Sequence, residues 1–314
     1  MENIAILMGG SSKEKEISLK SAKTIYNHID QNKYNAYTVM HINNHDFQVI
    51  INKEKYPIDK RTFSFILDKT NIQFHKVFMM IHGDPGENGK LCAFFDKKNI
   101  PYTSCNQKVS ELTFHKFQCN NYLRTIGYNV PSSQMASSNY NIKFPCIIKP
   151  SCSGSSFGIS KASNFEELQK AIIKAEKYDP EVIIEQFIIG REVTCAVFKD
   201  SNTIKTLPIT EIISENEIFD YDAKYNGKSI ERTPAHINTI LQEKIERISK
   251  ELYRVLEISG IVRIDFMIKK QTPYIIEINT VPGFSEESIV PQMLKHANID
   301  IQHFITTELR RLDG

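Results

Sequence analysis

Glycine is scarce in this sequence, and its placement narrows the possible folds more than any other feature. Only 13 of the 314 residues are glycine. Eight of them lie in four short polar segments, at Gly9, Gly10, Gly83, Gly86, Gly89, Gly154, Gly158 and Gly283. A chain that uses glycine sparingly places it where the backbone turns sharply or approaches a ligand closely. These segments are therefore the first candidates for binding loops.

The N-terminal part of the sequence predicts an α/β domain. The apolar run Ile4–Met8 is followed by Gly9-Gly10, and apolar residues then recur at helical spacing as far as Ile29. This order indicates a strand, a tight loop and a helix. A second buried strand is expected at Val77–Ile81, and we place the first domain boundary near residue 101.

Two more units are expected, at residues 102–185 and 186–314. The first of them begins with a helix predicted over Glu111–Ile126. It continues with a hairpin of Cys146–Lys149 and Ile159–Lys161, which encloses a polar loop rich in glycine and serine. The whole chain therefore divides into three units.

Residues 214–235 carry little hydrophobic periodicity. A polar loop of this length inside a compact domain is usually an active-site lid or disordered. The Asp, Tyr and Lys content of Phe219–Tyr225 favours a lid. A strongly amphipathic helix is predicted directly after it, over Thr239–Leu256.

Composition excludes several classes of protein. Lys plus Arg is 39 and Asp plus Glu is 37, so the formal net charge is +2. A charge so near zero argues against a general nucleic-acid or membrane-surface binder. No apolar run approaches the roughly 20 residues needed to span a bilayer. The six cysteines include no C-x-x-C pair, which argues against zinc and fits the reduced thiols of a cytosolic enzyme.

Two alternating segments near the C-terminus, Gly260–Lys269 and Tyr274–Asn279, predict an antiparallel hairpin. The apolar face of the second segment would carry Ile276 and Ile278. In the simplest register the opposed residues are Ile268 and Tyr274, Asp265 and Glu277, and Arg263 and Asn279. Directly opposed side chains lie about 5 Å apart at Cβ.

The polar face of this hairpin has the composition of a magnesium site. The opposed carboxylates of Asp265 and Glu277 repel each other unless a cation or a proton lies between them. With the amide oxygen of Asn279 they form an all-oxygen set, which suits Mg²⁺ or Mn²⁺ rather than zinc. The alternative is a solvated polar face of an edge hairpin. The loop Thr280–Ser285, which brings backbone amides and hydroxyls beside the carboxylates, favours the metal.

Seven segments in chain order carry a resemblance to a known family: GGSSKEKEISL, HGDPGENG, KPSCSGSSFGIS, EQFIIGRE, FDYDAKY, RIDF and EINTVPGFSEES. In these segments the chain resembles the D-alanine–D-alanine ligases of the ATP-grasp superfamily. The match extends over nearly the whole chain. It implies an α/β (α+β) fold of three domains, in which the second and third grip ATP and the first closes over the amino acids.

The resemblance also implies the reaction. ATP and two D-alanines would give D-alanyl-D-alanine, ADP and phosphate through D-alanyl phosphate, for peptidoglycan synthesis. Two Mg²⁺ or Mn²⁺ ions would assist. The partners would be small molecules only, with no nucleic acid or membrane, and the location would be the cytoplasm. A homodimer is expected by analogy.

Site residues follow from the resemblance position by position. The phosphates of ATP would contact Lys116, Lys149 and Lys224. The adenosine would contact Glu185, Ile188 and Glu192. The metal ligands would be Asp265, Glu277 and Asn279. Arg263 and the Gly283 N–H would stabilise the developing oxyanion.

The amino acids would be held by a second group of residues. The first D-alanine would meet Glu16 through its ammonium group and His82 through its carboxylate. The second D-alanine would meet Ser288 and Ile289. Hydrogen bonds from Ser155 and Tyr225 to Glu16 would lock the lid to the N-terminal domain.

Three other functions compete with this one. A D-alanine–D-lactate ligase or another ATP-grasp dipeptide ligase is the main alternative, and Lys224-Tyr225 favours the dipeptide product. A nucleotide-dependent dehydrogenase would need a G-x-G-x-x-G motif after the first strand, which the sequence lacks. A binding protein with an inactive site is disfavoured by the intact metal ligands and Arg263. The sequence departs from the family's common pattern at Ser153, where many members carry a carboxylate.

Overall fold

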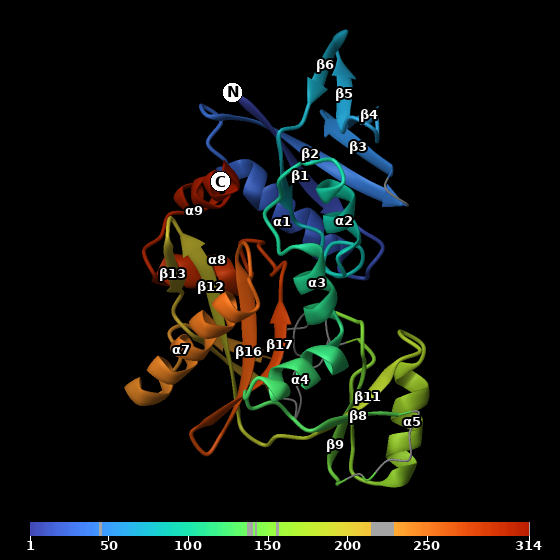
Figure 1. Cartoon of the computed structure of the whole chain (residues 1–314), viewed down its shortest axis with the longest axis vertical. Helices are drawn as coiled ribbons and strands as arrows, with labels where there is room; N and C mark the ends of the chain where they lie inside the picture. The colour runs from blue at the N-terminus through green and yellow to red at the C-terminus, as the bar shows by residue number, and fades with distance from the viewer. Residues whose placement is uncertain (44–45, 137–140, 142, 155–156, 215–228, 314) are drawn as a thin grey trace.

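The structure, a computed structural model, describes residues 1–43, 46–136, 141, 143–154, 157–214 and 229–313. Three main sheets lie one after another along the long axis of the molecule (Figure 1). In that view the N-terminal sheet is at the top. Strands β16 (Val262–Lys269) and β17 (Thr272–Asn279) lie in the middle, and the sheet with helix α5 (Phe165–Ala175) is at the lower right.

The first sheet has five strands in the order β4-β3-β2-β1-β7. They are β1 (Glu2–Gly9), β2 (Tyr34–Asn43), β3 (Asp46–Ile51), β4 (Glu54–Pro57) and β7 (Lys76–Met79). β1 is parallel to both β2 and β7, and a separate hairpin is formed by β5 (Ser64–Leu67) and β6 (Thr70–Gln73). The predicted α/β start is confirmed.

Helix α1 (Lys15–His28) begins where β1 and β7 end, and a serine fixes it there. Ser18 Oγ accepts a hydrogen bond from the Gly9 N–H at 2.9 Å and donates to the Met80 carbonyl at 2.6 Å. Helix α2 (Lys90–Asp96) follows the second glycine segment. Both glycine segments therefore meet at one edge of the sheet.

The second sheet is antiparallel, in the order β10-β9-β11-β8. Its strands are β8 (Ser133–Met135), β9 (Cys146–Pro150), β10 (Ser160–Ala162) and β11 (Val182–Gln186). Ile148 and Ile184 pack against Leu168 of α5 on one face. This confirms the predicted hairpin around the polar loop.

The helix predicted over Glu111–Ile126 is wrong as a single element. The structure has α3 (Gln107–Phe114) and α4 (Lys116–Thr125), which are separated at His115. His115 has φ −89° and ψ 92°, which is outside the helical region, and its side chain accepts from the Gln118 N–H to begin α4. The apolar residues keep their helical spacing across His115, so their periodicity could not reveal the break between the two helices.

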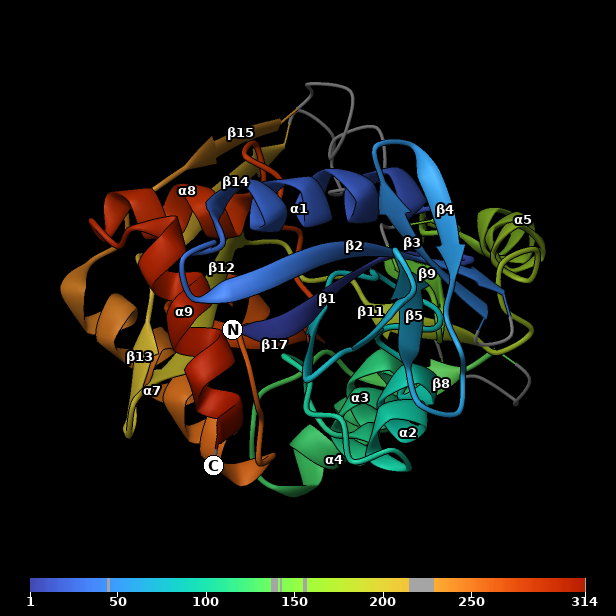
Figure 2. The ribbon, with the colours of Figure 1, turned by 90° about the horizontal axis from the view of Figure 1, so that it is seen from above.

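The third sheet has six strands, in the order β15-β14-β12-β16-β17 with β13 beside β12. The strands before the hairpin are β12 (Arg191–Asp200), β13 (Thr203–Thr206), β14 (Thr210–Ser214) and β15 (Ser229–Arg232). Helices α7 (Thr239–Val255), α8 (Ile289–His296) and α9 (Ile301–Arg310) and a 3₁₀ turn (Arg311–Asp313) complete the chain. In Figure 2, α9 lies beside α1 of the N-terminal unit.

The predicted opposition of Asp265 to Glu277 is confirmed, as is that of Arg263 to Asn279. The assumed pairing further along the hairpin is wrong. Ile268 faces Pro273 rather than Tyr274, because only two residues form the turn and the register shifts between Asp265 and Phe266. A one-residue bulge thus compensates for the shorter turn.

The bulge changes which isoleucines are buried. Ile275 and Ile278 are 1% and 4% exposed and belong to the core, whereas Ile276 is only partly buried. The prediction that Ile276 shares the buried face with Ile278 is therefore wrong.

Part of the loop predicted at 214–235 is regular structure. Residues 229–232 form β15, which pairs with β14. Residues 215–228, which carry most of the predicted lid, lie outside the described residues. Within the described ranges, none of the helices combines the length and apolar character needed to cross a membrane.

The apolar core consists of three clusters, and two of them join distant parts of the sequence. One combines the N-terminal sheet with Phe284, Leu294 and Phe304. The second places Cys119 and Leu123 against the third sheet, and the third lies under α5. The C-terminal segment is thus held against the N-terminal unit.

Candidate active site

The hairpin holds Asp265 in a dense polar network. Asp265 is 4% exposed. Arg263 donates through Nε to Oδ1 and through a terminal nitrogen to Oδ2, both at 2.9 Å. Thr194 Oγ1 donates to Oδ1 at 2.6 Å, and Asn279 Nδ2 lies 3.2 Å from Oδ2. The predicted oxyanion arginine and two predicted metal ligands are therefore in direct contact.

Glu277 faces a predicted phosphate lysine. Lys116 is the first residue of α4, and its Nζ lies 3.7 Å from Glu277 Oε2. The same Nζ donates to the Ser153 carbonyl at 2.5 Å. Lys116 thus bridges the polar loop and β17.

Two other predicted ATP contacts are bound to each other. Lys149 Nζ lies 2.5 Å from Glu185 Oε2, and both side chains are about 5% exposed or less. Asn120 Nδ2 donates to the other Glu185 oxygen at 2.6 Å. Ile188 is buried just beyond the end of β11, and Glu192 lies near the start of β12. Lys149 and Glu185 are therefore neighbours on the adjacent strands β9 and β11.

A cavity of about 290 Å³ lies between the N-terminal unit and the hairpin. Seven predicted site residues line it: His82, Arg263, Glu277, Asn279, Gly283, Ser288 and Ile289. Lining residues absent from the prediction include Glu14, Ile17, Lys20, Glu87, Gly154, Glu231 and Glu287. Segments far apart in sequence therefore converge on one polar chamber.

Glu16 lies apart from this cavity. Its side chain is exposed in the first turn of α1, whereas Glu14, directly before the helix, lines the cavity. A Cβ on Gly154 would lie 2.3 Å from Glu14 Oε2, and one on Gly83 would lie 2.9 Å from it. Two glycine segments thus leave room for the Glu14 carboxylate. The i, i+3 spacing of Glu14 and Ile17 was a usable signal for this face.

His82 lines the cavity but is already fully hydrogen bonded. It is 3% exposed, with Nδ1 2.7 Å from the Val281 carbonyl and Nε2 3.1 Å from Ser21 Oγ. A carbonyl only accepts, so Nδ1 carries the proton. Burial lowers the pKa of His82 and keeps the ring neutral. This arrangement is poorly suited to the substrate carboxylate contact predicted for His82.

Gly283 and Ser288 lie together at the start of α8. A Cβ at Gly283 would be 3.1 Å from Ser288 Oγ, so glycine keeps this approach open. Ser288 is the N-cap residue of α8, yet its hydroxyl caps no helix N–H and instead accepts from the Ser285 N–H at 3.0 Å. Ile289 begins the helix and is 8% exposed.

Glu87 is a site residue that sequence reasoning missed, although it belongs to a quoted motif. Its oxygens accept from the Gly83 N–H at 2.7 Å and from the Val281 N–H at 3.0 Å. Burial, with help from neighbouring Glu14, raises the pKa of Glu87 to about 7. His82 bonds to the Val281 carbonyl and Glu87 bonds to the Val281 N–H. The two side chains together therefore fix the backbone of Val281 in the loop before Gly283.

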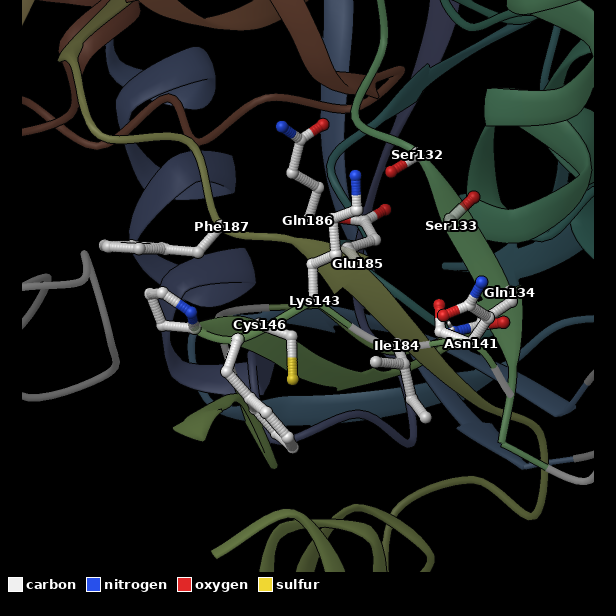
Figure 3. A pocket seen from close by; sticks show the side chains of 12 residues that line it. Ser132, Ser133, Gln134, Asn141, Lys143, Cys146, Ile184, Glu185, Gln186 and Phe187 are labelled. Atoms are coloured by element: carbon white, nitrogen blue, oxygen red, sulfur yellow. Dashed lines mark hydrogen bonds between the residues drawn. The ribbon is translucent and has the colours of Figure 1, made fainter. Parts of the chain in front are cut away.

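Three predicted residues, Ser155, Lys224 and Tyr225, lie outside the described residues. In the part of the chain that is described, no three His, Cys, Asp or Glu side chains form a metal-binding cluster. The candidate metal set is two carboxylates and one amide. A second hollow lies at the β8–β11 edge, where Cys146 and Ile184 point toward α5 and Gln186 points away (Figure 3).

Comparison with known proteins places this site in a family. The family model of the D-ala D-ala ligase N-terminus matches residues 3–105, and that of the C-terminus matches residues 114–309. A D-alanine–D-alanine ligase of Phocaeicola vulgatus is 41% identical, over 96% of this chain and 97% of the relative. That of Flavobacterium johnsoniae is 40% identical, over 98% of each.

Solved structures share the fold. The VanG D-Ala:D-Ser ligase from Enterococcus faecalis has a TM-score of 0.87 at 27% identity, covering 99% of both chains. A D-alanine–D-alanine ligase from Bacillus anthracis has a TM-score of 0.79 at 26% identity, covering 100% of this chain and 99% of that one. Fold and site together define an ATP-dependent ligase with the ATP-grasp fold. The chain belongs to the D-alanine–D-alanine ligase family.

Proposed function

We propose that this enzyme joins two D-alanines at the expense of ATP, through D-alanyl phosphate, to supply D-alanyl-D-alanine for peptidoglycan precursors. Relatives about 40% identical over their full length are D-alanine–D-alanine ligases. The observation that carries the proposal is the cavity between α1 and the hairpin. It combines carboxylates that attract an ammonium group with Arg263, a partner for carboxylate or phosphate oxygens.

The first D-alanine meets Glu14 rather than Glu16 in this proposal, since Glu14 is the carboxylate that lines the cavity. Its own carboxylate attacks the γ-phosphorus of ATP, and ADP leaves. The neutral amine of the second D-alanine, held near Ser288, then attacks the acyl carbon. The bond from that carbon to the bridging oxygen breaks, and phosphate leaves with this oxygen and takes up the proton that the amine nitrogen loses. Arg263 and the Gly283 N–H stabilise the tetrahedral oxyanion. His82 and Glu87 position the loop that carries Gly283.

The nucleotide lies between the second and third sheets in this proposal. Lys116 and Lys149 contact its phosphates as mobile point charges, with Lys224 as a further contact. Glu185, Ile188 and Glu192 contact its adenosine. The Lys149–Glu185 pair supports the assignment. Lys149 Nζ lies 2.5 Å from Glu185 Oε2, so the residues proposed to contact the phosphates and the adenosine are neighbours, as two contacts of one nucleotide would be.

The residues of the hairpin fit Mg²⁺ or Mn²⁺. Asp265, Glu277 and Asn279 offer hard oxygen donors on one face of adjacent strands. Bound there, two such ions would neutralise phosphate charge during transfer. Each Asp265 oxygen already accepts two hydrogen bonds, so at least one of the bonds from Arg263, Thr194 or Asn279 must be released before Asp265 binds a cation.

We also propose the domain division 1–101, 102–185 and 186–314, a homodimer and a cytoplasmic location. The three sheets support the division. The last two rest on the family alone. Light scattering of the purified protein would measure the oligomer.

The test of the proposed function is to quantify ADP and dipeptide in one quenched reaction. We expect one ADP per D-alanyl-D-alanine and no depsipeptide when D-lactate replaces part of the D-alanine. ADP release that requires D-lactate or L-alanine would refute the assignment.

A further inference from the structure

A serine, a histidine and a glutamate form a hydrogen-bonded chain beside the proposed nucleotide site. His115 Nδ1 lies 2.8 Å from Ser151 Oγ, and His115 Nε2 lies 2.8 Å from Glu181 Oε2. The order is that of a nucleophile, a base and an orienting acid. Ser151 is 0% exposed, however, so its hydroxyl has no route to a substrate. The chain of side chains therefore serves another purpose.

The partners of His115 define its protonation. Nδ1 also receives the Gln118 N–H, at 3.4 Å, at the start of α4. A backbone N–H can only donate, so Nδ1 is an acceptor and Nε2 carries the proton toward Glu181. One neutral imidazole thus joins the N-terminus of α4, the first residue of the polar loop and the residue before β11.

Main-chain bonds connect the same three places. The Lys116 N–H donates to the Ser151 carbonyl at 3.0 Å, and the Ser151 N–H donates to the Glu181 carbonyl at 2.7 Å. His115 is the residue at which α3 and α4 separate, and Lys116 comes directly after it. The direction in which Lys116 leaves the helix therefore depends on the His115 break.

The result of this geometry is seen at the Lys116 ammonium. Its Nζ reaches the Ser153 carbonyl and faces Glu277, although the side chain is long and has many rotamers. Only 11% of the Lys116 side chain is exposed. A charge held in place before the ligand arrives costs less ordering when the ligand binds.

We propose that His115 is a positioning residue for the nucleotide phosphates. Through Ser151 and Glu181 it fixes the direction of Lys116, whose ammonium group meets the Ser153 carbonyl and faces Glu277 before the phosphates bind. The inference rests on the proposed role of Lys116 and assigns His115 no contact with ATP. Its loss should weaken nucleotide binding and leave the amino-acid sites intact.

The test compares His115→Ala, Glu181→Gln, Glu181→Ala and Lys116→Ala with a matched control. Asn164→Ala is the control, because Asn164 caps α5 in the same way and lies in the same unit. We would measure KM for ATP and for D-alanine, the ADP dissociation constant by calorimetry without D-alanine, and Tm. For His115→Ala we expect KM for ATP and the ADP dissociation constant to rise about tenfold, equivalent to about 1.4 kcal/mol.

Other readouts separate positioning from general stability. In His115→Ala, kcat and KM for D-alanine should stay within about twofold, as expected when only ground-state nucleotide binding is lost. Glu181→Gln keeps an acceptor oxygen and should resemble the wild type, whereas Glu181→Ala should follow His115→Ala. In a Lys116→Ala background, His115→Ala should have little further effect, since it acts through Lys116.

Two results with His115→Ala would overturn the inference. One is that His115→Ala and Asn164→Ala lower Tm alike while ADP affinity stays at the wild-type value. The other is full additivity of His115→Ala with Lys116→Ala. If instead Lys116→Ala itself leaves ADP affinity unchanged, the proposed role of Lys116 is wrong, and the inference about His115 is overturned with it. If His115→Ala does not fold, Glu181→Ala and Glu181→Gln provide the same comparison.

Discussion

Glu14 and Glu16, which are separated by one residue, have different surroundings in the structure: Glu14 lines the cavity and Glu16 is exposed. Glu14 and Glu16 belong to one charged run, and composition treats them as equivalent. The structure separates them, because the helix begins at Lys15 and only one face of it meets the cavity. The position of a residue relative to the start of a helix, rather than its type, decides which carboxylate reaches the cavity.

Substitution of each glutamate tests this distinction. Glu14→Gln removes the negative charge from the cavity, so kcat/KM for the first D-alanine should fall by about 10-fold or more, the scale of a lost charged hydrogen bond. Glu16→Gln should stay within about twofold of wild type, as an exposed surface change. Steady-state kinetics at saturating ATP give both numbers. Equal losses in the two variants would contradict the assignment of Glu14.

Arg263 offers a second test at this scale. Its fork holds both Asp265 oxygens, a geometry that the single ammonium of lysine cannot reproduce. Arg263→Lys should lower kcat by roughly 10²–10³-fold. This corresponds to a rise in activation free energy of about 2.7–4 kcal/mol, which is typical of a lost oxyanion donor. Single-turnover kinetics would measure it. A change confined to KM for ATP would show that Arg263 binds only ground-state phosphate.

Glu87 should make stability depend on pH. Its folded-state pKa of about 7 lies above the ordinary 4.5, so the folded protein holds a proton that the unfolded chain releases. The stability that this proton contributes is fully present below the unfolded-state pKa of 4.5 and is lost as the pH rises through the folded-state pKa of about 7. Glu87→Gln cannot titrate, so its free energy of unfolding should fall less between about pH 5 and about pH 8. Urea unfolding measures this, with Glu16→Gln as the control, and an unchanged slope would refute it.

At the scale of the elements, the position of the site was predictable, whereas the geometry that produces it was not. Alternation placed Asp265 opposite Glu277, and the structure agrees. That agreement depends on a bulge that offsets a two-residue turn. Lys270 and Gln271 both have positive φ. The sequence gives no sign of this turn, because it has no Asn-Gly or Gly pair at these positions. The alternation of apolar and polar residues predicts which residues of a strand share a face, but it does not predict where a bulge inserts an extra residue.

The break between α3 and α4 shows the same limit. Propensity and apolar spacing favour one helix, but the bonds of His115 to Ser151 and Glu181 come from distant segments. Tertiary contacts therefore decide the local structure. No single-sequence signal reports a partner that is 36 residues away.

Two loops meet through a cation and two rings. Lys13 Nζ, from the first glycine segment, lies 4.8 Å from the Phe157 ring centroid and 4.6 Å from that of Tyr178. This contact joins the N-terminal unit to the loop over the proposed phosphate site. It is the kind of exposed contact worth about 0.5–1 kcal/mol.

Lys13→Ala should therefore lower kcat/KM about two- to fivefold without a measurable change in Tm. Lys13→Arg should retain activity, since guanidinium also stacks on aromatic rings. Lys98→Ala is the matched control, because Lys98 Nζ lies 4.8 Å from the Phe94 ring centroid and neither residue lines the cavity. If both alanine variants behave alike, the contact has no role in closing the site.

At the scale of the whole molecule, the site is where the three sheets approach each other. The fold class and the family could be predicted from the motifs, because seven characteristic segments occur in the family's order along the chain. The shared core could not. Phe304 of α9 stacks on Phe284 at 5.6 Å and meets Phe198 at 5.4 Å, which ties the C-terminal segment to the loop after Gly283. Such long-range packing has no periodic signal.

Glu277 is a residue at which these parts meet. It lines the same cavity as Glu14 and lies opposite Asp265 and 3.7 Å from Lys116. We propose that the β16–β17 hairpin holds the metal that makes ATP reactive toward D-alanine. Loss of one of two opposed carboxylates should weaken the cation site while relieving repulsion in the fold.

The most direct test is a magnesium titration of ADP release by Glu277→Gln and the wild type. For Glu277→Gln we expect a raised magnesium requirement and turnover lower by roughly 10²-fold or more, as for a lost electrostatic contact in the transition state, with Tm unchanged or slightly higher. Wild-type turnover of Glu277→Gln at limiting magnesium would show that the hairpin does not hold the metal.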